Sequence, residues 1–202
     1  MPGILRASVF FIIATALVSG VVVDSALSTV NTGQVEALWK DYVVAEKRLQ
    51  FDVANLLGHQ WPELQSVAGL QRDQQFALIE LRNMKFQYLL EFDSDRIVYD
   101  GGLSQFADFE WTDADSEALR EANPDFLKLE RWTEKNSERL SEHPDLVVAS
   151  ESLTKLQRDE RYQTMIERYQ ARMDDLESAL DTISRAKKRS ERTKALKSQI
   201  GR

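Results

Sequence analysis

The sequence predicts an all-α protein, an antiparallel bundle of long helices with a coiled-coil-like seam that follows an N-terminal apolar segment. Three observations lead to this fold class. The 202 residues include only eight glycines and four prolines, too few turn formers for many short strands. Long segments repeat apolar residues at helical spacing. Three of the four prolines, Pro62, Pro124 and Pro144, stand in x-Pro-acid-apolar sequences typical of helix starts.

Residues 1–28 contain an uncharged apolar segment. Ala7 to Val23 reads ASVFFIIATALVSGVVV, and its 17 residues are near the lower limit for a helix that spans a bilayer. We expect a retained single-pass anchor. A signal peptide cut after Ala26-Leu27-Ser28 is the alternative. The residues that represent the predicted membrane segment are Ala7, Phe10, Ile13, Leu17 and Val23.

The charges beside this segment predict its orientation. Arg6 precedes it, and the first basic residue after it is Lys40. Because positive residues favour the cytoplasmic side, we expect the body of the protein outside the cytoplasm. The expected location is therefore the membrane, with a secreted or periplasmic protein as the alternative.

The body begins with a helix expected over residues 31–57, followed by a helix that starts at Pro62. The first has an apolar stripe, and the second is apolar on several faces between Phe76 and Phe92. A helix of that kind is usually buried between others. We therefore expect the Pro62 helix to lie centrally, between the helices of residues 31–57 and 159–183. The stripe of the first helix is Val35, Leu38, Tyr42, Ala45, Leu49, Val53 and Leu56.

Residues 93–112 interrupt the helical pattern with Gly101-Gly102 and several aromatic residues. We expect a connecting loop that packs Phe106, Phe109 and Trp111 onto the bundle. Shorter helices are expected to start at Thr112, Pro124 and Pro144. Asn123 is a good N-cap before Pro124, and Thr112 begins a sequence close to a capping box.

The last long helix has the most regular apolar pattern. Its apolar residues alternate steps of four and three, which is a heptad seam over three repeats. We expect this seam to carry packing in the bundle, and a homo-oligomer is compatible with it. The seam consists of Tyr162, Ile166, Tyr169, Met173, Leu176, Leu180 and Ile183.

Charge is distributed unevenly along the chain. Residues 185–202 carry eight basic residues and one acid, whereas the other 184 residues carry 18 basic and 32 acidic ones. The acidic body argues against binding of nucleic acid. The basic tail is either a solvated helix end or a contact for an anionic surface. The residues expected in such a contact are Lys187, Lys188, Arg189, Arg192, Lys194 and Lys197.

Catalytic and metal-binding motifs are missing from the sequence. The absence of cysteine excludes disulfides, thiolate zinc sites and a cysteine nucleophile. His59 lies four residues before Glu63, but Pro62 separates them, and His143 has no evident partner. The acids of residues 93–115 are expected to form a solvated loop, with weak cation binding as the alternative. We expect no catalytic residue, no cofactor and no metal.

Several short motifs resemble the LemA family of membrane-anchored helical proteins. They are Trp39, Lys47-Arg48 and Asn55-Leu56-Leu57 in the first helix, then ELQSVAGLQR from Glu63 and HPDLVVASESLTKLQ from His143. Val53-Ala54 replaces the family's Ile-Pro, and residues 92–123 have no counterpart in the family. The resemblance implies a long helical bundle behind a retained anchor. It implies no catalytic residues.

These patterns divide the chain into an anchor or signal peptide (1–28), a helical bundle (29–184) and a basic tail (185–202). The predicted function is that of a single-pass membrane-anchored protein of the cell envelope, a non-enzymatic interaction or scaffold module with protein partners. The first alternative is a cleaved, soluble exported helical protein that binds or chaperones others. The second is an enzyme that uses the carboxylates of residues 93–115.

Overall fold

The computed structural model describes residues 32–200, the side chains of residue 194 and residues 197–200 excepted. Within this range the regular structure is entirely helical, which confirms the predicted all-α class. The α-helices are α1 (Thr32–Gln60), α2 (Gln65–Phe92), α3 (Gly102–Ala107), α4 (Asp113–Ala122), α5 (Pro124–Ser141), α6 (Leu146–Leu156) and α7 (Glu160–Ile200). Two 3₁₀ helices, η1 (Pro62–Leu64) and η2 (Ser94–Arg96), precede α2 and α3.

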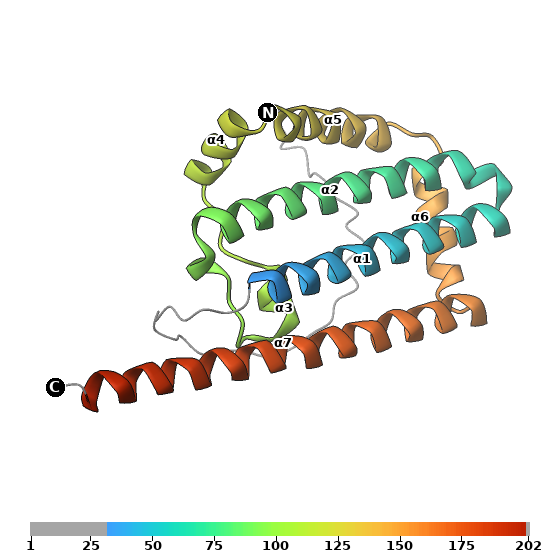
Figure 1. Ribbon diagram of the computed structural model, residues 1–202. Helices are drawn as coiled ribbons and strands as arrows, with labels where there is room; N and C mark the ends of the chain where they lie inside the picture. Colours follow the sequence, from blue (N-terminus) through green and yellow to red (C-terminus); the bar gives the residue numbers. More distant parts are fainter. Residues whose placement is uncertain (1–31, 201–202) are drawn as a thin grey trace, which may run out of the picture.

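The long helices lie side by side in the order α5, α2, α1, α7, with neighbours antiparallel (Figure 1). α6 closes one end of this row, and α3 packs against α7 towards the other end. The expectation that the Pro62 helix lies between the first and last helices is wrong, because α1 occupies that place. The predicted stripe of α1 covers only one face, whereas Trp39 and Val43 extend the buried surface round the helix. α2 is covered on its other side by α5.

Local signals place several helix starts as expected. The Asn123 side chain accepts hydrogen bonds from the backbone N–H groups of Asp125 and Phe126, and Pro124 is the first residue of α5. Thr112 and Asp115 form a reciprocal capping box at the start of α4. Pro62 begins η1, which leads directly into α2. Pro144 instead lies in a turn, and α6 begins two residues later at Leu146.

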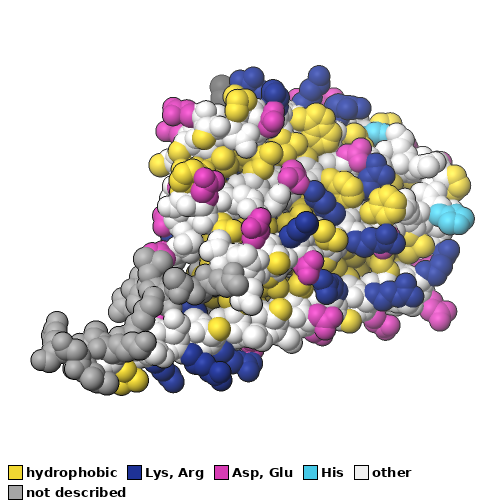
Figure 2. Space-filling model, viewed as in Figure 1, with side chains coloured by type: hydrophobic (Ala, Val, Ile, Leu, Met, Phe, Trp, Pro, Cys, Tyr) yellow, Lys and Arg dark blue, Asp and Glu magenta, His cyan; other side chains and the backbone are white. Residues whose placement is uncertain are grey.

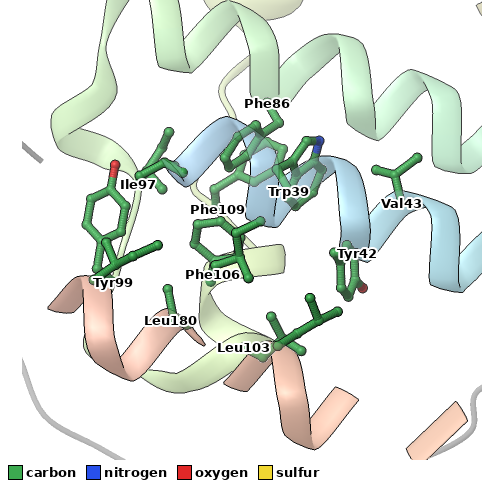
Figure 3. Close-up of a cluster of buried hydrophobic side chains, with 14 of the residues drawn as sticks. Trp39, Tyr42, Val43, Phe86, Ile97, Tyr99, Leu103, Phe106, Phe109 and Leu180 are labelled. Atoms are coloured by element: carbon green, nitrogen blue, oxygen red, sulfur yellow. The ribbon is translucent and has the colours of Figure 1, made fainter. Parts of the chain in front are cut away.

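The larger core cluster is built around stacked aromatic rings (Figure 3). The rings of Trp39 and Phe86 stack with centroids 3.9 Å apart, and Phe106 and Phe109 meet both of them edge-on. Burial of Phe106 and Phe109 agrees with the prediction that residues 93–112 pack onto the bundle. That segment is more ordered than a simple loop, because it contains η2 and α3.

The predicted seam residues of α7 all lie on its inward side. Tyr162, Leu176, Leu180 and Ile183 are buried, and the remaining three are half-buried. They divide between two core clusters, since Tyr162 joins Leu57, Leu64 and α6, whereas Leu180 joins the aromatic cluster. Supercoiling of α7 with a single partner helix stays a prediction. α7 itself continues well past Ile183, where the sequence predicts its apolar pattern to stop.

Candidate functional site

Most acids of residues 93–115 are exposed, in agreement with a solvated segment, but Asp115 in the first turn of α4 is held in an ion pair. Arg96 donates to both carboxylate oxygens of Asp115 at 3.0 and 2.8 Å, and it lies 3.7 Å from Asp93. Hydrogen bonds from Arg96, outweighing partial burial, hold the pKa of Asp115 well below its usual value. In the described range of the chain, no group of three or more acidic or histidine side chains could hold a metal ion.

The two histidines lie apart from each other in the structure. His59 is exposed in the last turn of α1, where it lines a hollow of ≈ 310 Å³ together with Asn55, Gln65 and Arg72. His143 accepts a 3.2 Å hydrogen bond from the backbone N–H of Asp145 through its Nδ1 atom. The same nitrogen lies 3.9 Å from Asp145 Oδ2.

A shallow groove lies between α2 and α5. Its volume is ≈ 450 Å³. Hydrophobic side chains gather on this face over α5 and α2, interspersed with charged ones (Figure 2). Trp132 is 41% exposed at the groove, an unusual state for a side chain with so much apolar area. We call this surface the α2–α5 groove; it is lined by Lys47, Asp73, Phe76, Ala77, Glu80, Leu129 and Trp132.

One edge of the α2–α5 groove is fixed by a chain of polar contacts that reaches into the core. Lys47 Nζ lies 2.5 Å from Glu80 Oε2, and Asn83 donates to Glu80 Oε1 at 3.0 Å. Asn83 in turn accepts a 3.0 Å hydrogen bond from Trp39 Nε1. Partial burial opposes ionisation of Glu80, but the hydrogen bonds from Lys47 and Asn83 hold its pKa below the usual value. The groove therefore has an apolar floor and a rigid charged edge.

A buried amide pair joins the two helices that form the α2–α5 groove. Asn136 Nδ2 donates to Gln74 Oε1 at 2.9 Å, and both side chains are buried between α5 and α2. Such a pair fixes the register of two helices, because a sliding movement would leave buried amide groups without partners. The register of α5 on α2 determines where Trp132 lies. Trp132 is one turn before Asn136 on α5 and lies over the groove.

Residues 185–200 of α7 form the second candidate surface, which we call the basic extension. It projects beyond the end of the bundle (Figure 1). Lys187 Nζ lies 4.7 Å from the ring centre of Tyr99, and Lys188 Nζ lies 3.4 Å from Asp100 Oδ2. These two residues of the predicted anionic contact therefore also contact the bundle. Arg189 and Arg192 are exposed, and the side chains of Lys194 and Lys197 lie outside the described residues.

The predicted membrane segment, represented by Ala7, Phe10, Ile13, Leu17 and Val23, also lies outside the described residues. Among the helices of residues 32–200, none combines the length and apolar character needed to cross a bilayer. The structure therefore describes the bundle and the basic extension, and the anchor stays a prediction from sequence.

Sequence reasoning missed a polar network between α1 and α7. The Tyr169 hydroxyl donates to the Glu46 carboxylate, and Tyr42 lies beside the same carboxylate. Burial first, and then the negative charge of Glu46, raise the pKa of Tyr42 to about 12 and also raise the pKa of Tyr169. The sequence pattern identifies Tyr42 and Tyr169 only as apolar positions, because helical spacing does not show that the Tyr169 hydroxyl meets a carboxylate 123 residues away.

Sequence reasoning also missed the α2–α5 groove. A tryptophan in the highly charged α5 is the one available signal, since Trp132 has acidic or basic residues at most nearby positions. Whether such a residue is covered depends on which helices lie beside it, which local patterns do not reveal.

Comparison with protein-family models, with curated proteins and with solved structures found no match for this chain. The resemblance to the LemA family accordingly rests on the short motifs quoted above. Any proposal about the function of this protein depends on the two surfaces just described and on the sequence before Thr32.

Proposed function

We propose that this protein is a single-pass membrane-anchored module of the cell envelope whose helical bundle binds a protein partner through the α2–α5 groove. The observation that carries the binding proposal is the exposed Trp132 above an apolar floor that includes Phe76 and Leu129. Tryptophan is enriched among residues that dominate binding energy at interfaces. The proposal involves no chemical reaction.

The form of the α2–α5 groove favours an amphipathic helix as the occupant. The groove runs along two packed antiparallel helices, so a third helix can lie on it as a continuation of the same packing. Its lining combines Phe76, Leu129 and Trp132 with Lys47 and Glu80, charges already paired with each other. An apolar stripe on the partner would cover the rings, and its polar flanks would meet the charged edge.

Site-specific photo-crosslinking tests the proposed occupant. A benzophenone amino acid replaces Trp132 in the full chain, and the matched control carries it at Phe92, which is 65% exposed at the far end of α2. The expected result is a discrete adduct from position 132 alone, mapping to an amphipathic helix of the partner. A synthetic peptide of that helix should bind the purified protein, and Trp132→Ala should weaken its binding about tenfold or more.

Other results of this experiment would change the proposal. Adducts between two copies of the chain would identify the α2–α5 groove as a self-association surface. The same adducts from positions 132 and 92, or none from either, would remove the groove from consideration.

The anchor is tested by fractionation combined with an intact-mass measurement of the native protein. Support for a retained anchor comes from the length of the apolar segment and from Asp24, which is unfavourable beside a cleavage site. We expect the full mass in the membrane fraction after carbonate extraction. A soluble product shorter by about 28 residues would favour the exported, cleaved protein instead.

A further inference from the structure

We propose that the basic extension lies on an anionic lipid surface beside the N-terminal anchor, so that the bundle is attached to the membrane at two points and held in one orientation. Of the proposed function, this inference uses only the retained N-terminal anchor. It does not depend on the α2–α5 groove.

Antiparallel packing brings the start of α1 and the basic extension to the same end of the molecule (Figure 1). Val35 and Leu38, in the first two turns of α1, share a core cluster with Leu180 and Ile183 of α7. Thr32 therefore lies close to the point where α7 leaves the bundle. Whatever holds the chain before Thr32 at a surface also brings the basic extension towards that surface.

Chain length makes this proximity effective. Nine peptide units join Val23 to Thr32, and a chain of that length spans at most about 30 Å. The 16 residues of the basic extension form a helix roughly 24 Å long. When residues 7–23 lie in a bilayer, the extension is thus held within reach of the headgroups. Tethering raises the effective concentration of each extension at the surface without any new contact.

The side chains of the basic extension divide into two groups. Lys187 and Lys188 hold its base against Tyr99 and Asp100, which fixes the direction in which the helix leaves the bundle. This contact orients the rest of the helix. The lysines nearest the bundle therefore act as a brace rather than as the lipid contact.

The remaining exposed arginines form one face. Arg185, Arg189 and Arg192 follow at steps of four and three, and Leu196 continues the same face at 59% exposure. Arginine binds phosphate oxygens in a bidentate manner, and an exposed leucine among basic residues is typical of helices that lie at the membrane interface. Arg185 also pairs with Asp181 at 3.2 Å, but both side chains are well exposed, so the pair is weak and screened.

Energy transfer from the protein to the bilayer surface tests the inference with the full chain. The chain has no cysteine, so single introduced cysteines can be labelled specifically. Thr193→Cys places a donor dye on the basic extension, and His59→Cys places the control dye at the opposite end of α1. The protein is reconstituted into vesicles that contain phosphatidylglycerol or only phosphatidylcholine, each with a headgroup acceptor dye.

We expect strong energy transfer from position 193 in phosphatidylglycerol vesicles. High salt, or vesicles of phosphatidylcholine alone, should reduce it, and transfer from position 59 should be weak under all these conditions. The variant R185Q/R189Q/R192Q should lose the lipid-dependent part of the transfer. The matched variant R139Q/K155Q/R158Q removes the same charge around α6, at the opposite end, and should retain it.

The outcomes separate the two proposals. Release of the protein from vesicles on flotation contradicts the anchor and hence the proposed function. Retention with equal transfer from position 193 in both lipids, or no change in R185Q/R189Q/R192Q, overturns the two-point attachment and leaves the anchor intact. If position 193 shows no lipid-dependent transfer but the basic extension binds a soluble polyanion, the partner of the extension is an acidic macromolecule. The lipid proposal is then wrong.

Discussion

The backbone N–H of Leu103 donates a 2.6 Å hydrogen bond to Glu177 Oε2, joining residues 74 positions apart in the chain. The contact ties the start of α3 to α7 and depends on Gly102, whose φ of 80° turns the chain towards Glu177. A Cβ atom at Gly102 would lie 3.0 Å from Glu177 Oε1.

Gly102→Ala should therefore destabilise the protein by about 1–2 kcal/mol, because alanine is strained at positive φ and the Glu177 carboxylate must shift. Gly69→Ala is the matched control, since Gly69 lies inside α2 and a Cβ there would meet nothing within 4 Å apart from its own helix backbone and chain neighbours. That variant should be stabilised by roughly 0.5–1 kcal/mol. Urea unfolding measures both values. Equal effects of the two substitutions would contradict the arrangement of α3 on α7.

Removal of a ring from the aromatic cluster should be costly. Phe86 is fully buried and stacked on Trp39, so Phe86→Ala should lower the free energy of unfolding by about 3–5 kcal/mol. Phe92→Ala removes the same side chain from a site that is 65% exposed and should cost well under about 1 kcal/mol. Thermal unfolding followed by circular dichroism distinguishes the two variants.

The Asp115–Arg96 pair should make stability depend on pH in acid. Hydrogen bonding to Arg96 lowers the pKa of Asp115 in the folded state, so its ionised form favours folding. The contribution is complete above the unfolded pKa of about 4 and is lost as pH falls towards the folded value. Asp115→Asn should lower stability at about pH 7 and flatten its decline towards about pH 3. Asp125→Asn, which removes a carboxylate from a well-exposed pair with Lys128, is the matched control.

A charge placed on the inward side of α7 tests the packing of that helix. Leu176 is 3% exposed, so Leu176→Asp buries a carboxylate among apolar groups and should cost several kcal/mol, about 3 or more. Ala179→Asp adds the same charge at an exposed position three residues later. It should melt close to the parent. Sedimentation of the parent and of Leu176→Asp shows in addition whether the seam joins two copies of the chain. If the parent is a dimer and the variant is a folded monomer, the seam is an interface between copies.

The expected orientation in the membrane can be examined with a single cysteine. His59→Cys lies at an exposed position at the end of the bundle formed by the α1–α2 connection. If the body lies outside the cytoplasm, a membrane-impermeant maleimide should label the cysteine at position 59 while the membrane that holds the anchor is still intact. Labelling that requires lysis of the inner membrane would reverse the orientation inferred from Arg6.

Local chemistry explains which parts of this fold were predictable. Asn123 and Thr112 determine their helix starts through hydrogen bonds to residues two or three positions away, so a short stretch of sequence contains the whole interaction. The position of α1 between α2 and α7 depends instead on Trp39 and Val43 meeting residues far along the chain. An apolar residue beside a stripe does not itself indicate which helix will cover it.

The candidate surfaces were predictable to different degrees for the same reason. The charge of the basic extension is a property of its own sequence. The brace from Lys187 and Lys188 to Tyr99 and Asp100 joins segments 88 residues apart and could not be inferred. Trp132 is exposed because α1, α2 and α5 leave the groove uncovered, a consequence of packing that appears in no local pattern.

The pairing of α1 with α7 also has a consequence for the order of folding. α1 and α2 are joined by a short turn and can pair early, whereas Arg172 meets Asp41 across 131 residues. Because α7 is synthesised last, α1 and α2 can pair while the side of α1 that α7 covers in the finished bundle still has no partner. That side of α1 includes Val35 and Leu38. It stays uncovered during synthesis until Leu180 and Ile183, near the end of the chain, have been made. A chaperone that protects this protein would therefore be expected to recognise a face that the finished bundle never displays.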